Sequence, residues 1–303
     1  MKGRSDHEWD REYTDLVRKA LIDGVTEAKA KLEPASLQTG VGTSAANINR
    51  RAREADGKIS LGLNPEGPTD RQIGLIKLTR ADSSTIAVVA NYAIHGTVLG
   101  GKSEVISGDA PGVVAAYVEE KLRAPMLFIN GAAGDTAPIY SVYNDPKSGH
   151  LSQFQVLLGD RILDSEKRLA AAVSDVALQV DSTFVESPLR SGLQWPPELA
   201  KYLRSDPSGR SLVRLPIRFL RMKDTVVWAA PVELFSEIAV NIRMKSPFRQ
   251  TFYFGYTNGW FGYLPTAAAF GEGGYEPTTS VLTDSAEADL TRHVLKYLNG
   301  ARP

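Results

Sequence analysis

A continuous apolar segment that ends near a lone histidine constrains the fold of this chain more than any other feature. Residues 85–93 read Thr-Ile-Ala-Val-Val-Ala-Asn-Tyr-Ala, without alternation of polar and apolar side chains. That pattern is typical of a strand buried on both faces of a sheet. His95 follows it, at the kind of strand tip where α/β proteins build their sites. The segment therefore predicts a covered sheet with a candidate functional histidine at its edge.

Hydrophobic periodicity along the rest of the chain predicts both helices and strands, without an internal repeat. A turn at 81–84 is expected to make a hairpin of its two flanking strands, and 139–153 is expected to be an exposed loop. We expect a single α/β or α+β domain over 1–303, with a mixed β-sheet flanked by helices. Helices are expected at about 10–32, 111–122, 154–173, 232–244 and 284–297, and strands at about 36–42, 71–79, 84–94, 126–130, 175–186, 212–222, 225–230 and 249–255.

Composition excludes several classes of function. Lys+Arg and Asp+Glu number 35 each, so no basic field is available to attract nucleic acid. No apolar run approaches the roughly 20 residues of a membrane span. The first ten residues are charged and carry no signal-peptide core. Cysteine is absent, so any metal must be held by nitrogen and oxygen.

A phosphate-binding loop is the first alternative to weigh. Residues 96–103, Gly-Thr-Val-Leu-Gly-Gly-Lys-Ser, fit the pattern G-x-x-x-x-G-K-[ST] after a strand. The pattern binds phosphate only if a helix begins at Lys102 and Ser103. The next residues include Gly108, Pro111 and Gly112, which disfavour a helix there.

Histidines and hydrolase motifs narrow the chemistry further. The sequence has neither Gly-x-Ser-x-Gly nor His-Glu-x-x-His, so the usual serine-hydrolase elbow and zincin helix are unsupported. Only four histidines occur, at 7, 95, 150 and 293. His150 and His293 are expected at the surface, in a polar loop and in the last helix. His95 has the context of a site residue, although a histidine that only hydrogen bonds within the core is the alternative.

Seven short motifs occur in a characteristic order. They are Asn49-Arg50, Asp70, Asn91 to Thr97, Ile106 to Asp109, Gly134 to Pro138, Pro231 to Glu233, and Gly262 to Thr266 with Tyr275 beyond it. Taken together they resemble the neutral/alkaline ceramidase family, and the similarity is strongest over 13–283. The resemblance implies a zinc-dependent amidohydrolase of the class that cleaves the N-acyl bond of ceramide.

The resemblance implies a role for each matching residue. His95, Glu233 and Tyr263 would hold a Zn²⁺ ion, which generates a hydroxide near neutral pH and polarises a carbonyl. Arg50 would reach into the pocket and Tyr275 would contact the scissile amide, and phenol or guanidinium donors stabilise a developing oxyanion. Asp135 is grouped with these catalytic residues, and with Asp109 it would support the neighbouring turns. Trp260, Phe261 and Phe270 could line an acyl channel or serve as core.

Two departures from the family pattern bear on mechanism. The family's first metal histidine should precede the first helix and has no counterpart, so we expect a member shortened at its N-terminus; His7 could in principle substitute. Ala137 stands where the family has a serine with a catalytic role. An attack by activated water survives this change, whereas a serine acyl-enzyme does not. Thr136 would point to the other side of an extended backbone. No C-terminal immunoglobulin-like domain is expected.

The main hypothesis is a metal-dependent hydrolase that cleaves an acyl amide or ester of a lipid-like small molecule. An inactive family member that serves as a binding or scaffold protein is the alternative, and a nucleotide-binding protein is the third. Contact with a membrane surface is compatible with the sequence. The compartment and the oligomeric state stay open, since relatives are often exported or membrane-associated while no signal peptide is seen in this chain.

Overall fold

The computed structural model describes residues 8–100, 103–139 and 150–301, which form two compact units, 1–35 and 36–303. The first unit contains α1 (Glu8–Ala30). Ion pairs one turn apart, Lys19 with Asp23 and Lys31 with Glu27, support this helix at 2.5 Å each. The helix expected at 10–32 is confirmed within two residues.

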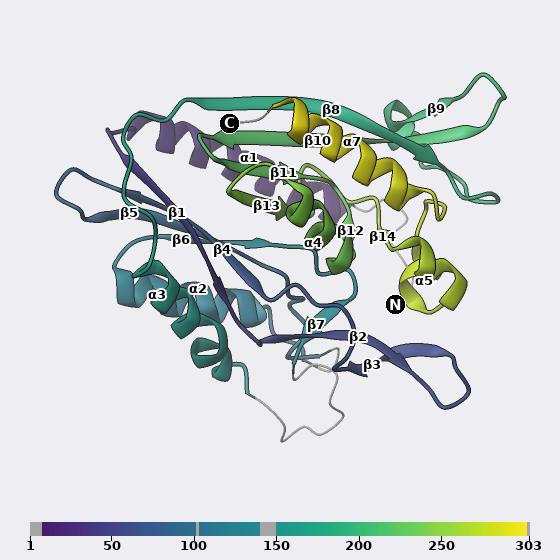
Figure 1. Cartoon of the computed structure of the whole chain (residues 1–303), viewed down its shortest axis with the longest axis horizontal. Helices are drawn as coiled ribbons and strands as arrows, with labels where there is room; N and C mark the ends of the chain where they lie inside the picture. The colour runs from purple at the N-terminus through teal and green to yellow at the C-terminus, as the bar shows by residue number, and fades with distance from the viewer. Residues whose placement is uncertain (1–7, 101–102, 140–149, 302–303) are drawn as a thin grey trace. The chain divides into compact units, whose positions relative to one another are not determined.

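The first sheet of the second unit contains the predicted histidine strand. Its members are β1 (Ser36–Thr43), β4 (Gln72–Thr79), β5 (Thr85–Tyr92) and β6 (Met126–Asn130), in the order β1-β4-β5-β6. The sheet is mixed, because β5 and β6 are parallel and the other pairs are antiparallel. Two helices, α2 (Asp109–Leu122) and α3 (Asp160–Glu166), lie on the same side of it (Figure 1). Val88 and Ala90 of the sheet are fully buried together with Val114 and Ile162 of these helices.

The second sheet forms the other main core. It runs β13-β11-β10-β8, with β9 paired to β10, and only β11 and β13 are parallel. Along it α7 packs against β8 and against α4 (Figure 1). The largest cluster of buried side chains lies here and includes Leu215, Trp228 and Leu290. The elements are β8 (Leu178–Pro188), β9 (Leu203–Ser205), β10 (Ser211–Met222), β11 (Thr225–Ala229), β13 (Gln250–Phe254), α4 (Ser236–Lys245) and α7 (Ala286–Gly300).

The two sheets approach closely between β4 and β13. A Cβ added at Gly74 would lie 2.7 Å from the Phe252 ring, so only glycine permits this approach. The Asn91 side-chain amide also crosses between the sheets and donates to the Tyr253 carbonyl at 3.0 Å. These contacts fix the end of β5, and so the position of His95, against the second sheet.

Two small sheets and several short helices complete the unit. The strands of these sheets were not predicted: β7, β12 and β14 have only two or three residues and carry no readable period, and β2 and β3 are rich in polar residues. Of the short helices, η1 lies within the helix expected at 154–173. The sheets are β3-β2-β7, from β2 (Asn47–Arg53), β3 (Ile59–Asn64) and β7 (Thr136–Pro138), and β12-β14, from β12 (Glu233–Leu234) and β14 (Tyr263–Leu264). The helices are η1 (Gln155–Gly159), η2 (Pro197–Tyr202), α5 (Ala267–Glu272) and α6 (Tyr275–Thr279).

The α/β class and the mixed pairing of strands are confirmed, with several sheets in place of one. Two expected helices differ from the structure. The helix expected at 154–173 ends at Glu166, because Val173 exchanges backbone hydrogen bonds with Leu37 at 2.8 and 2.9 Å and so must be extended. The helix expected from Val232 begins at Ser236. The loop expected at 139–153 lies mostly outside the described residues.

Candidate active site

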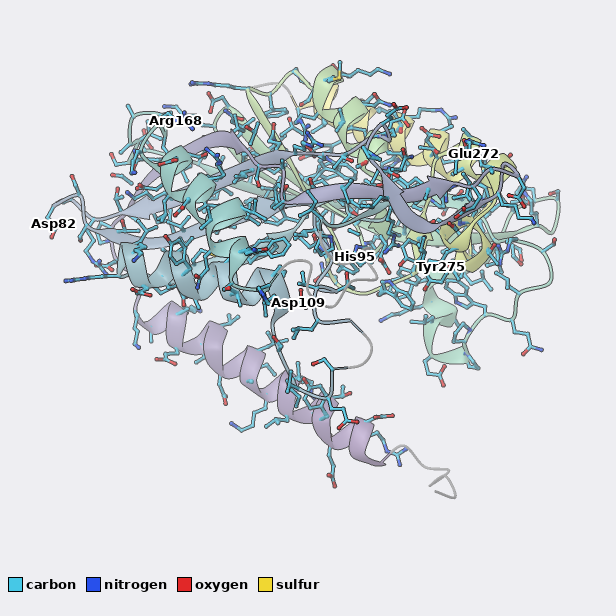
Figure 2. The ribbon with its side chains drawn as sticks, turned by 90° about the horizontal axis from the view of Figure 1, so that it is seen from below. Asp82, His95, Asp109, Arg168, Glu272 and Tyr275 are labelled. Carbon is cyan, nitrogen blue, oxygen red and sulfur yellow. The ribbon has the colours of Figure 1, made fainter. Side chains whose placement is uncertain are left out.

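His95, labelled in Figure 2, lies three residues beyond β5, and each of its ring nitrogens has a partner within hydrogen-bond distance. Nδ1 is 2.8 Å from the Thr136 carbonyl oxygen. A carbonyl only accepts, so the ring proton is on Nδ1. Nε2 is 3.0 Å from Glu233 Oε2. The backbone of β7 therefore fixes the tautomer that presents Nε2 to the carboxylate.

Glu233 and Tyr263 are brought together by strand register. In the parallel pair β12-β14 they lie directly opposite each other. Glu233 is buried, and it accepts hydrogen bonds from Tyr256 Oη at 3.1 Å and Trp260 Nε1 at 2.8 Å. Burial alone would raise the pKa of Glu233, but its contacts with the His95 ring and with the Trp260 N–H outweigh burial and lower that pKa. The carboxylate is therefore held in its charged form.

Arg50 lies between these groups and a buried glutamate. Its Nη2 donates to Tyr263 Oη at 3.1 Å and to the Gly134 carbonyl at 2.9 Å, and its Nε donates to Glu276 Oε1 at 2.9 Å. Nη1 is 3.4 Å from His95 Nε2. Burial lowers the pKa of Arg50, but the Glu276 charge and the Tyr263 contact outweigh it and raise that pKa. The guanidinium stays charged, and Nη1 is the nitrogen with the longest hydrogen-bond contact.

Tyr275, labelled in Figure 2, lies beside Tyr263 and is exposed to solvent. Its ring meets Tyr263 edge to face, with centroids 5.6 Å apart, and the Arg50 guanidinium lies 6.0 Å from its centroid. It is 48% exposed, as Trp260 is 61% exposed. These two aromatic side chains are therefore the ones that an approaching molecule can touch.

Asp135 and Asp109 hold backbone rather than facing the histidine. Asp135 is buried, and its oxygens accept from Ser236 N at 2.8 Å, Ser236 Oγ at 3.1 Å and Asn49 Nδ2 at 3.2 Å. Burial raises the pKa of Asp135 to about 6, against the effect of these hydrogen bonds. Asp109, at the start of α2, accepts from the backbone N–H groups of Val98 and Leu99 at 3.0 Å each. Both contact sets support turns beside the site.

The donor set fits a zinc ion. With its proton on Nδ1, His95 presents a lone pair at Nε2 to an ionised carboxylate oxygen 3.0 Å away. Two acceptors at that distance require a proton or a cation between them. Tyr263, in register with Glu233, adds a third donor, and N/O sets of three protein ligands are typical of catalytic zinc. The described residues contain no group of three or more His, Cys, Asp and Glu, so the tyrosine is needed to complete the set.

The serine position of the resemblance is occupied by a buried methyl group. Ala137 is 3% exposed and lies opposite Ile48 in the β2-β7 pair. Thr136 beside it is fully buried, and its hydroxyl is directed to Asp135 at 3.4 Å. Neither side chain offers an accessible hydroxyl, so covalent catalysis from this turn has no nucleophile.

Other candidate residues lie outside this cluster. Residues 103–108 are not helical and α2 begins only at Asp109, so the helix that a phosphate loop needs is absent at Ser103. Lys102 and His7 lie outside the described residues. His150 is exposed as expected. His293 is half-buried rather than fully solvated, 3.1 Å from Thr183 Oγ1, and burial lowers its pKa.

Glu276 and Tyr256 belong to the site and were missed from the sequence. Glu276 is fully buried and joins Arg50 to Arg51, whose Nη1 donates to Oε2 at 2.8 Å. A fully buried glutamate is rare unless paired, but burial cannot be read from Gly-Tyr-Glu-Pro alone. Tyr256 is in the same glycine-rich segment as Trp260, and position in that segment was the only signal for it.

Comparisons with known proteins identify a related family and a shared fold. Residues 5–146 match the family model described as neutral/alkaline non-lysosomal ceramidase, N-terminal. No curated protein matches the sequence. The predicted resemblance to this family is confirmed over the matched residues, which include Arg50 and His95.

Two solved structures share the fold. A neutral ceramidase from Pseudomonas aeruginosa has a TM-score of 0.70 and 17% identity, covering 92% of this chain and 54% of its own. A ceramidase complexed with C2 has a TM-score of 0.72 and 16% identity, covering 94% of this chain and 57% of its own. This chain thus spans little more than half the length of either. At these identities the likeness establishes the ceramidase fold. Among the described residues no helix is long and apolar enough to cross a membrane.

Proposed function

We propose that this chain is a zinc-dependent, ceramidase-like hydrolase that cleaves an acyl amide or acyl ester of a lipid-like substrate. The observation that carries the proposal is the approach of His95 Nε2 to Glu233 Oε2, 3.0 Å, in a tautomer that leaves two acceptors facing each other. His95, Glu233 and Tyr263 would hold the ion. When bound, zinc supplies a Lewis acid and lowers the pKa of a coordinated water.

The remaining side chains have distinct tasks in this proposal. Arg50 Nη1, the guanidinium nitrogen without a carboxylate or carbonyl partner, donates to the substrate oxygen on which negative charge develops. Tyr275, exposed beside Tyr263, contacts the scissile group from the solvent side. Ala137 supplies no nucleophile, so water attacks the carbonyl carbon directly. Amide and ester bonds are both open to that route, and Asp135 keeps the turn beside Arg50 in place.

A binding or scaffold protein that has lost its metal is the second candidate. It is favoured by the guanidinium of Arg50, whose Nη1 is 3.4 Å from His95 Nε2, because a fixed cation can satisfy acceptors that a metal would otherwise join. The absence of a hydroxyl at Ala137 favours it as well. In this candidate the cluster is only an ion-paired network.

Elemental analysis of the purified chain separates the two candidates. We expect about one zinc per chain, and loss of zinc in His95→Ala but not in His150→Ala, the exposed control. Zinc addition should raise the melting temperature of the wild type and leave that of His95→Ala unchanged. Hydrolysis of N-acyl amides and acyl esters should follow the zinc content. Absence of zinc from the wild type after zinc-supplemented purification would overturn the metal proposal and support the scaffold.

A further inference from the structure

An apolar pocket opens beside the candidate active site. It has a volume of about 250 Å³ and is lined mainly by Leu189, Leu193, Trp195, Leu199, Trp260 and Phe261. Among the residues that the structure describes, Gln194 and Thr279 are the polar side chains of its lining, and no charged side chain lines it. Such a lining favours a hydrocarbon group and offers nothing to a charged or strongly hydrogen-bonding one.

Trp260 connects the pocket to the site. Its indole ring lines the pocket while its Nε1 donates to Glu233 Oε1 at 2.8 Å. Gly262 also lines the pocket, and its carbonyl accepts from the Glu233 backbone N–H at 3.0 Å. A molecule whose polar group is bound at Glu233 would therefore have the pocket directly beside it.

The far wall of the pocket is held in place without a ligand. Trp195 stacks on Phe261 with ring centroids 5.8 Å apart, and its Nε1 donates to the Leu199 carbonyl at 2.8 Å. Arg190 donates to the Val281 carbonyl through its backbone at 2.9 Å. The Arg190 guanidinium also donates to the Pro277 and Thr278 carbonyls, at 2.8 and 2.7 Å, at the end of the helix that begins with Tyr275. The pocket is preformed and tied to the elements of the site.

The size of the pocket limits its occupant. An engineered cavity of about 150 Å³ takes up benzene, with six carbons. By that measure 250 Å³ accommodates about eight to ten carbons. The part of an acyl amide or ester that carries no polar group next to the carbonyl carbon is the acyl chain, whereas the leaving amine or alcohol of a lipid usually bears further polar groups. The apolar lining therefore suits the acyl side.

We propose that this pocket binds the acyl chain of the substrate and selects chains of about eight to ten carbons. The selection rests on the proposed hydrolase function, whereas binding of an alkyl chain does not. The walls that set the limit are Trp195 and Leu199 from one segment and Val281 from another, and neither segment belongs to a site motif.

Cleavage of one series of substrates tests the selection. N-acyl amides of a single fluorogenic amine, with 2 to 16 acyl carbons, would be offered to the zinc-loaded full chain. We expect kcat/KM to rise about fourfold per methylene up to about eight to ten carbons and then to level off or fall. At a fixed acyl chain, lengthening the leaving amine should change kcat/KM little. A continued rise to 16 carbons, or a cut-off that follows the amine instead, would overturn the proposal.

Two substitutions should move the cut-off in opposite directions. Leu199→Ala should shift the preferred length upward by two or three carbons, because it removes part of the wall, and Val281→Phe should shift it downward. Val180→Phe, at an exposed position of β8, is the matched control and should leave it unchanged. The preferred length is read from the ratios of kcat/KM for different acyl chains within one protein. It therefore does not depend on the fraction of a variant that is folded. An unchanged cut-off in Leu199→Ala would contradict the assignment.

A binding measurement separates this proposal from the hydrolase itself. Primary alcohols from butanol to dodecanol are neutral probes, and their binding can be followed by the fluorescence of Trp195 and Trp260. We expect affinity to increase with length and to stop increasing at about eight to ten carbons. That cut-off without any cleavage would support the pocket and refute the hydrolase. Cleavage without dependence on acyl length would support the hydrolase and refute the pocket.

Discussion

Glu276 holds Arg50 in the site through a hydrogen bond of 2.9 Å between Oε1 and Nε, and the Glu276 side chain is only 1% exposed. The other carboxylate oxygen accepts from Arg51 at 2.8 Å. A single buried charge thus orients two guanidinium groups, of which only that of Arg50 reaches Tyr263 and His95. Residues 226 positions apart in the sequence are joined in this way.

Removing that charge should destabilise the protein strongly. In Glu276→Gln the buried Arg50 guanidinium loses its carboxylate partner, while Arg51 keeps Glu272, and breaking a buried pair from one side costs about 3–5 kcal/mol. Glu272→Gln is the matched control, since the Glu272 side chain is 39% exposed and Arg51 keeps the buried Glu276; a pair open to solvent contributes about 0–1 kcal/mol. Urea unfolding of both variants measures the difference. Equal losses of unfolding free energy in the two variants would show that the buried ion pairs of Glu276 stabilise the fold no more than the exposed Glu272 does.

A pair of glycine substitutions tests the packing of the two sheets. Gly74→Ala places a methyl group 2.7 Å from the Phe252 ring and should lower the free energy of unfolding by about 1–3 kcal/mol. At Gly112, inside α2, an added Cβ meets nothing within 4 Å, so Gly112→Ala should raise it by about 0.5–1 kcal/mol. Chemical denaturation decides both signs. A stabilised Gly74→Ala would mean that the sheets separate easily at this point.

The sequence predicted those helices and strands that have a long and regular hydrophobic pattern. The largely apolar residues 85–93, without polar alternation, indicated the strand β5, and β6 has the predicted bounds, 126–130. Glu233 was expected in the first turn of a helix and lies instead in a two-residue strand. The reason is non-local, because Glu233 pairs with Tyr263, thirty residues later, and no local propensity encodes that register.

In the site, too, some residues were predicted from the sequence and others were not. His95, Glu233, Tyr263, Arg50 and Tyr275 were selected by a family resemblance, and the structure brings them together. The buried partner Glu276 and the pocket wall around Trp195 were not found. Both depend on which side chains are buried against which neighbours, a property of the folded chain that short motifs do not report.

Because of Asp135, the folded protein should gain free energy of unfolding at acidic pH and lose it toward neutral pH. Burial raises the pKa of Asp135 to about 6, from 3.8 in an exposed carboxyl. Because the folded-state pKa is the higher one, the folded chain binds more protons between these values, and stability falls as the pH rises through this window. The group should cost about 3 kcal/mol at pH 7 relative to pH 3.5.

Urea unfolding from pH 3.5 to 7 of the wild type and Asp135→Asn measures this contribution. The asparagine does not ionise, so the difference in unfolding free energy between the two proteins should change by about 3 kcal/mol across the window. The absolute stability of the variant is not the readout, since it also loses hydrogen bonds from Ser236. Parallel pH profiles of the two proteins would show that Asp135 does not titrate in this range.

The two tyrosines around Glu233 should affect zinc affinity to different degrees. Tyr263 is proposed as a ligand, while Tyr256 donates to Glu233 Oε2 at 3.1 Å and so only orients a ligand. Loss of an orienting hydrogen bond typically weakens metal affinity by about 10- to 100-fold, so Tyr256→Phe should fall in that range and Tyr263→Phe should lose more. Competition of each variant against a chromogenic zinc chelator gives both affinities without any measurement of activity. If Tyr263→Phe binds zinc as well as Tyr256→Phe does, Tyr263 does not coordinate the ion, and the set His95, Glu233 and Tyr263 is wrong.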